Sequence, residues 1–117
     1  MSYGESLNST SEVLQVDPAR MSEIIRRVVE VAQPEKIILF GSRAAGSARS
    51  DSDVDLLVVK STSQRRKLAM EIYRKLLGVG CAVDVIVVTP EDIERYGKVP
   101  YLIIEPALRE GKLVYAA

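Results

Sequence analysis

Apolar residues recur along the chain with the spacing of an amphipathic helix in some regions and as short continuous runs in others. The helical spacing is clearest over residues 18–32. Asp17 is a favourable N-cap and Pro18 suits the first helical position, while Pro34 ends the pattern. The sequence therefore predicts a helix over 18–32, with a buried face formed by Met21, Ile24, Ile25, Val28, Val29 and Ala32.

Four short apolar runs between turn-forming residues predict strands over 36–40, 54–60, 81–89 and 112–115. None of these runs is long enough to cross a bilayer. Helices alternate with the strands along the chain. This order predicts an α/β (α+β) fold, in which helices pack against a small mixed β-sheet.

Helical spacing also appears between and after the later strands. A helix is predicted over 64–77, with its N-terminus capped by a side chain of 61–63. Its inner face is expected to consist of Leu68, Ile72, Leu76 and Leu77. Tyr73 on the same helix is interpreted as a packing residue. Thr89-Pro90 indicates a further helix start, and a last helix is predicted from about residue 100 to 110.

The N-terminal residues differ from the rest in composition. Residues 1–16 are rich in Ser, Asn, Thr and Glu, so we expect a flexible arm there and one folded domain over 17–117. The first residues lack the basic and apolar regions of a signal peptide. We therefore expect a soluble, cytoplasmic protein with no membrane association.

Composition excludes several classes of function. Lysine plus arginine and aspartate plus glutamate both number 16, so the net charge is zero, which argues against bulk binding of nucleic acid or of an anionic membrane. Cys81 is the one cysteine, so no intramolecular disulfide can form. The chain has no histidine, which excludes Ser-His-Asp and Cys-His catalysis and any histidine metal site.

Three aspartates form the main candidate for chemistry. Asp53 and Asp55 stand two residues apart at the start of a predicted strand, so both side chains project to one face, with Cα atoms about 6.6 Å apart. If the next strand lies alongside, Asp84 stands about 4.8 Å away. Such carboxylates repel by about 4 kcal/mol per pair, and binding Mg²⁺ or Mn²⁺ relieves the repulsion. The alternative is that they are strand-end aspartates facing water.

The residues after the first predicted strand form a candidate phosphate loop. Gly41 allows a sharp turn, Ser42 supplies a hydroxyl and Arg43 a guanidinium that matches phosphate. The spacing from Gly41 to Gly46 is that of a Walker A loop, but Ser47 stands where its lysine is required. Arg43 also breaks the dinucleotide-binding fingerprint. Taken alone, such a segment is more often a plain turn.

The combination of these features is more specific than each part. Gly41-Ser42, Asp53-x-Asp55 eleven residues past the serine, and Asp84 in a later strand resemble the DNA polymerase β-type nucleotidyltransferase superfamily. The string FGSRAAGSARSDSDVDLLV, residues 40–58, is similar to its minimal nucleotidyltransferase branch, which contains antitoxins of the MntA type. The resemblance extends over residues 18–116.

This resemblance implies a fold, a reaction and a site. The fold is that of the polymerase β-like nucleotidyltransferases, and the reaction is transfer of a nucleotide, AMP from ATP, to an acceptor hydroxyl. Gly41 and Ser42 would bind the phosphates, while Asp53, Asp55 and Asp84 would hold two Mg²⁺ ions. The partner implied is a helical HEPN-domain toxin, for which this chain would be the antitoxin.

One departure and two alternatives accompany this interpretation. The branch usually has arginine where Ala45 stands, which puts one phosphate or acceptor contact in doubt. The first alternative is a non-catalytic antitoxin that neutralises its partner by occlusion. The second is a small-molecule (antibiotic) nucleotidyltransferase, but such enzymes carry an added helical acceptor domain. We expect the acceptor surface to come from another chain.

Overall fold

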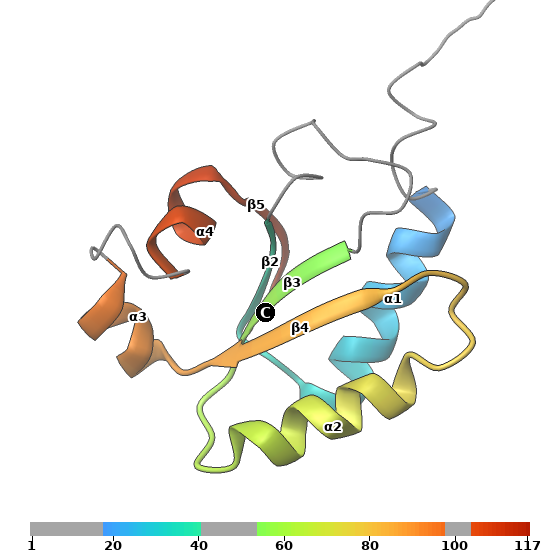
Figure 1. Cartoon of the computed structure of the whole chain (residues 1–117), viewed down its shortest axis with the longest axis horizontal. Helices are drawn as coiled ribbons and strands as arrows, with labels where there is room; N and C mark the ends of the chain where they lie inside the picture. Colours follow the sequence, from blue (N-terminus) through green and yellow to red (C-terminus); the bar gives the residue numbers. More distant parts are fainter. Residues whose placement is uncertain (1–17, 41–53, 98–103) are drawn as a thin grey trace, which may run out of the picture.

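The computed structural model describes residues 18–40, 54–97 and 104–117. In these ranges four strands form one sheet in the order β4-β3-β2-β5 (Figure 1). The strands are β2 (Lys36–Phe40), β3 (Val54–Val59), β4 (Val83–Val88) and β5 (Lys112–Ala116), and the helices are α1 (Pro18–Ala32), α2 (Arg65–Lys75), α3 (Pro90–Tyr96) and α4 (Ile104–Glu110). β2 is antiparallel to β3 and β5, whereas β3 and β4 are parallel, which confirms the mixed sheet.

Three predicted features lie outside the described residues. They are the N-terminal arm over 1–16, the candidate phosphate loop with Asp53, and the start of the last predicted helix. Within the described ranges, no helix is both long and apolar enough to cross a membrane.

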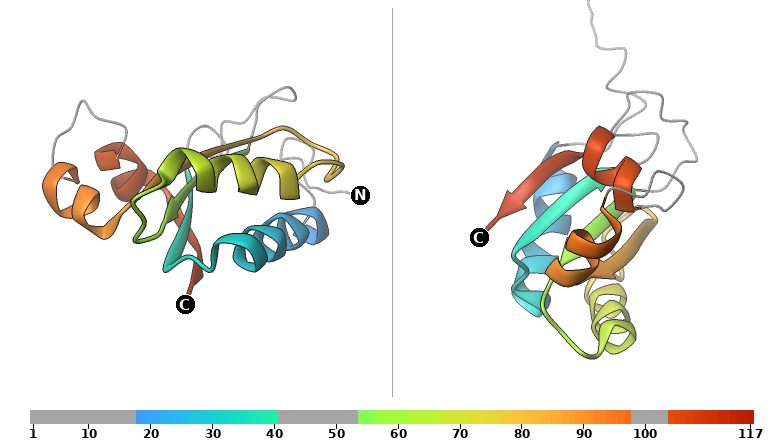
Figure 2. Two further views of the ribbon diagram at one scale, coloured as in Figure 1. Left: turned by 90° about the horizontal axis from the view of Figure 1, so that it is seen from below. Right: turned by 90° about the vertical axis from the view of Figure 1, so that its left-hand side faces the viewer.

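The sheet has a hydrophobic cluster on each face, and the helices form two groups, α1 with α2 and α3 with α4 (Figures 1 and 2). The α1/α2 cluster contains the buried face predicted for the first helix, including Ile24, Val28 and Ala32, together with Ile72 of α2. The α3/α4 cluster contains Ile104 and Ala107 of α4 together with residues of three strands, Ile38, Phe40, Leu57, Val59 and Val88. Strand side chains alternate between the faces, so β2, β3 and β4 contribute to both clusters, whereas Val114 and Tyr115 of β5 pack against the α1/α2 cluster.

The end of α2 differs from the prediction. Leu77 was expected to face the core, but it is 76% exposed. The helix ends at Lys75, and the chain turns through Gly78, whose φ of +82° is a conformation that glycine adopts without strain. Since the helical repeat stops before Leu77, this residue no longer shares the inner face with Ile72 and Leu76.

Of the two predicted helix caps, the one at the start of α3 is confirmed and the one at the start of α2 is wrong. Thr89 caps α3 as predicted: its Oγ1 accepts from the Asp92 amide at 3.1 Å, and the Asp92 carboxylate accepts from the Thr89 amide at 2.9 Å. The cap predicted for α2 is wrong, because its N-cap is Gln64 and makes no side-chain capping bond. Thr62 Oγ1 accepts from the amide of Gln64, which stabilises the preceding turn and not the helix itself.

At the β5 end of the described sheet the pairing is irregular. Ile37 pairs with Tyr115, but the next residue, Ile38, pairs with Leu113. Val114 is therefore an extra residue on β5, a β-bulge that bends the strand and increases its twist.

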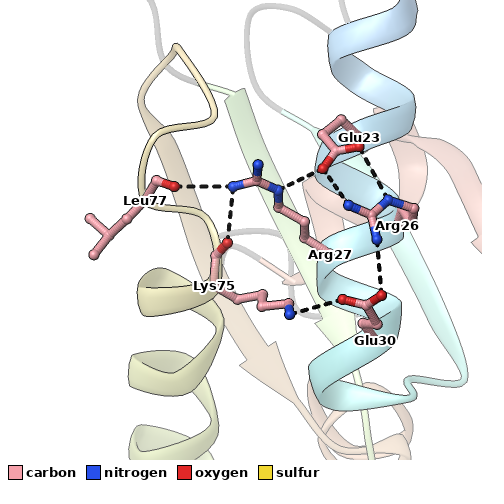
Figure 3. Close-up of polar contacts among 6 residues, drawn as sticks. All are labelled: Glu23, Arg26, Arg27, Glu30, Lys75 and Leu77. Atoms are coloured by element: carbon pink, nitrogen blue, oxygen red, sulfur yellow. Dashed lines mark hydrogen bonds and ion pairs between the residues drawn. The ribbon is translucent and has the colours of Figure 1, made fainter.

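A polar cluster joins α1 to the end of α2 (Figure 3). Arg27 donates to the backbone carbonyls of Lys75 at 3.2 Å and Leu77 at 3.0 Å, and Glu23 accepts from Arg27 Nε at 2.7 Å. The Lys75 ammonium also lies 2.9 Å from the Glu30 carboxylate. A guanidinium at the C-terminal carbonyls of a helix satisfies groups that have no helical partner and complements the helix dipole. Side-chain hydrogen bonds from Arg26 and Arg27 lower the pKa of the Glu23 carboxyl to about 2.

This lowered pKa predicts a stability change in acid. The contribution of Glu23 is fully present above its ordinary pKa of 4.5 and is lost as pH falls from there through about 2. The Glu23→Gln variant should melt at a lower temperature than the wild type at neutral pH, with the difference shrinking in acid. Thermal melts between about pH 7 and pH 2.5 measure this. Glu94→Gln, an exposed change on α3, is the control; parallel curves for all three proteins would contradict the assignment.

Candidate metal and nucleotide site

Two of the three candidate carboxylates lie side by side across a pair of parallel strands. Asp55 of β3 and Asp84 of β4 are register partners. Register partners on neighbouring strands stand about 4.8 Å apart and project to the same face. The strand of Asp84 thus lies beside the strand of Asp55, which was the condition for bringing these two carboxylates together.

The alternation of side chains places both aspartates on the face covered by α3 and α4. Leu57 and Val59, two and four residues beyond Asp55, belong to the cluster on that face. Val54 and Leu56 belong to the opposite cluster. Asp55 is half-buried and Asp84 is exposed. Both stand at the start of their strands, whereas α3 follows the far end of β4 (Figure 1).

The end of β2 belongs to the same row of register partners, the residues that lie side by side across neighbouring strands. Phe40, the last residue of β2, is the register partner of Asp55 on the other side of β3. Because β2 is antiparallel to β3, its C-terminal end and the first residues of β3 and β4 share one edge of the sheet. Gly41, Ser42 and Arg43 follow Phe40 directly in the sequence. They lie outside the described residues, so their role in binding phosphate stays a prediction.

The carboxylates of Asp55 and Asp84 are suited to binding a hard divalent cation. Two carboxylates about 4 Å apart repel by about 4 kcal/mol at an effective dielectric of about 20, and a cation between them relieves this cost. Carboxylate oxygens are the ligands that Mg²⁺ and Mn²⁺ prefer. Among the described residues no group of three or more potential ligands gathers. Those residues supply two of the three predicted carboxylates, because Asp53 falls outside them.

Two cavities among the described residues lie away from the aspartates. The larger, about 530 Å³, is lined by residues of α1 and β5, among them Ile25, Val29, Val114 and Tyr115. Val114 and Tyr115 pack against the α1/α2 cluster, on the face opposite the aspartates. The smaller, about 140 Å³, lies at the start of α2. Neither cavity includes a candidate site residue.

One contact next to the site has no signal in the sequence. The hydroxyl of Tyr73 accepts from the backbone amide of Val85, the residue after Asp84, at 2.8 Å. Tyr73 was interpreted as a packing residue, yet it is 41% exposed and bonds to the backbone. Only the packing of α2 on β4 brings these residues together, so no local pattern could have indicated the contact.

Residues 22–117 match the family model described as polymerase beta, nucleotidyltransferase, and the chain belongs to this family. A comparison with curated proteins gives no match.

Two solved structures have a similar fold. One is a protein from Sulfolobus solfataricus, described as a candidate nucleotidyltransferase, with a TM-score of 0.58 and 22% identity over 93% of this chain and 90% of that one. The other is a chain of a toxin–antitoxin complex with AMP-PNP, with a TM-score of 0.60 and 16% identity over 87% of this chain and 75% of that one. At these identities the two structures support the fold.

If Asp55 and Asp84 bind a cation, the melting temperature of the protein should rise when that cation is added. Binding to the folded state adds about 2.7 kcal/mol at about 100 times the Kd. Asp84→Asn removes one charged ligand, and a tenfold loss of affinity would reduce this gain by about 1.4 kcal/mol. Thermal melts in EDTA and in Mg²⁺ should therefore show a smaller Mg²⁺-dependent shift for Asp84→Asn than for wild type. Glu91→Gln, exposed on α3, should respond like the wild type. If Mg²⁺ raises the melting temperature of Asp84→Asn as much as that of the wild type, Asp84 is not a ligand of the cation.

Proposed function

We propose that this protein is a Mg²⁺-dependent nucleotidyltransferase that transfers AMP from ATP to a hydroxyl group of a helical partner protein and acts as that partner's antitoxin. The observation that carries the proposal is the in-register pair Asp55 and Asp84 at the sheet edge where β2 ends. Membership of the polymerase β nucleotidyltransferase family supports the class of reaction.

In this proposal, each of the three aspartates has a role at the metal site. Asp55 and Asp84, together with Asp53, hold the cations. Cations held there would supply positive charge to the triphosphate and to the reacting oxygens. Asp53 and Asp55 orient the triphosphate. Asp84 is the more exposed of the two described carboxylates, so it can meet the acceptor and help to take the proton from its hydroxyl.

The segment after β2 supplies the phosphate contacts. Backbone amides around Gly41 and Ser42 donate to phosphate oxygens, and Arg43 pairs with phosphate charge. The same groups hold the pyrophosphate as it leaves. With Ala45 in place of the arginine usual in the branch, this chain relies on Arg43 for its guanidinium contact.

The proposed partner is a HEPN-type toxin. Similarity to a chain of a toxin–antitoxin complex with AMP-PNP supports both a toxin partner and an adenine nucleotide. The acceptor is then a hydroxyl of the partner, and a tyrosine side chain is the candidate.

This proposal predicts a covalent change in the partner. Co-expression or incubation of the two proteins with ATP and Mg²⁺ should add about 329 Da, ATP minus pyrophosphate, to the partner's intact mass. Asp55→Asn should reduce the modification at least about a hundredfold, because the remaining groups cannot replace the lost metal ligand. Glu94→Gln, on the surface of α3, should modify the partner at the wild-type rate.

Two outcomes would contradict the proposal in different ways. If Asp55→Asn modifies the partner as fast as the wild type does, the pair of aspartates does not take part in catalysis. A partner that is never modified but is still neutralised by the Asp55→Asn protein would show that occlusion alone makes this chain an antitoxin.

A further inference from the structure

The backbone of β4 has polar groups on its outer side. In a parallel ladder, successive residues direct their amide and carbonyl groups to alternate sides of the strand. The amides of Val54 and Lys60 donate to the carbonyls of Ala82 and Val88, so the even-numbered residues of β4 face β3. The backbone groups of Val85 therefore face away from β3, and in the described part of the chain β4 is the last strand on that side.

Tyr73 of α2 satisfies these outward groups at one position. Its hydroxyl accepts from the Val85 amide at 2.8 Å and lies 3.4 Å from the Val85 carbonyl oxygen, to which it donates at the long limit of a hydrogen bond. A single side chain thus replaces, at Val85, the contacts that a neighbouring strand would make. In both views of Figure 2, α2 runs beside β4.

The position of this contact connects it to the candidate site. The amide of Val85 and the carbonyl of Asp84 belong to the same planar peptide group. The carbonyl side faces β3 within the ladder, and the amide side is bound by Tyr73. The peptide plane is therefore fixed from both sides, and this fixes the backbone from which the Asp84 carboxylate projects.

We propose that Tyr73 is a positioning residue for the metal site: by fixing the Asp84–Val85 peptide, its hydroxyl orients the Asp84 carboxylate toward Asp55. The inference rests on the proposed function. Tyr73 bonds to the outer side of β4, whereas the Asp84 side chain projects from the face covered by α3 and α4, so Tyr73 acts only through the backbone. Groups that orient a metal ligand typically change metal affinity 10–100-fold when removed.

The test uses Tyr73→Phe in the full-length chain, with Mn²⁺ alone as the probe. The change removes one hydroxyl and keeps the ring, and water can reach the partly buried contact because Tyr73 is 41% exposed, so the melting temperature should fall by less than about 5 °C. The Kd for Mn²⁺, measured by paramagnetic titration, should rise about tenfold. Amide hydrogen exchange at Val85 should accelerate at least tenfold. The control is Tyr115→Phe, a partly buried tyrosine on β5, which should bind Mn²⁺ within twofold of wild type.

The outcomes separate this inference from the proposed function. If Tyr73→Phe binds Mn²⁺ like the wild type while Asp84→Asn loses binding, the metal site stands and the positioning role is overturned. If Asp84→Asn binds Mn²⁺ as tightly as the wild type, the metal site itself is wrong and the inference falls with it. A drop in melting temperature far beyond that of Tyr115→Phe, with unchanged Mn²⁺ affinity, would assign Tyr73 to folding instead.

Discussion

The register between the parallel strands β3 and β4 is the constraint on which both the core and the site depend. In the observed register, Asp55 faces Asp84, and their neighbours on each strand enter the α1/α2 cluster. A slip of one residue would turn one strand's aspartate into that cluster, where an unpaired charge costs several kcal/mol. The hydrophobic packing that makes the sheet stable therefore also aligns the two carboxylates.

This dependence gives α1 and α2 a part in aligning Asp55 with Asp84, although they pack on the other face of the sheet. They cover the face opposite the aspartates and hold the even-numbered residues of β3 in place. The polar cluster of Glu23, Arg27, Glu30 and Lys75 joins the two helices, through Arg27 on the Lys75 carbonyl and Lys75 on the Glu30 carboxylate. Each of its exposed ion pairs contributes little alone, but Arg27 also binds backbone carbonyls that have no helical partner.

The sequence predicts the strands well and the contacts between elements poorly. β2 was predicted over its observed range, and the start of α1 follows Pro18 as expected, because apolar runs and proline act locally. The pairing of Asp55 with Asp84 could be anticipated only on the condition that their strands are neighbours, which the structure shows. The exposure of Leu77 and the contact of Tyr73 with Val85 could not, because both depend on where one element stops and which element packs on it.

The two ends of the described sheet have a further consequence for association. Tyr73 occupies backbone groups on the outer side of β4, and the bulge at Val114 makes β5 irregular. Both features hinder the addition of another strand, the usual route from an open sheet to fibrils or swapped dimers. The two outer sides of the described sheet are therefore poor templates for pairing with further copies of the same chain.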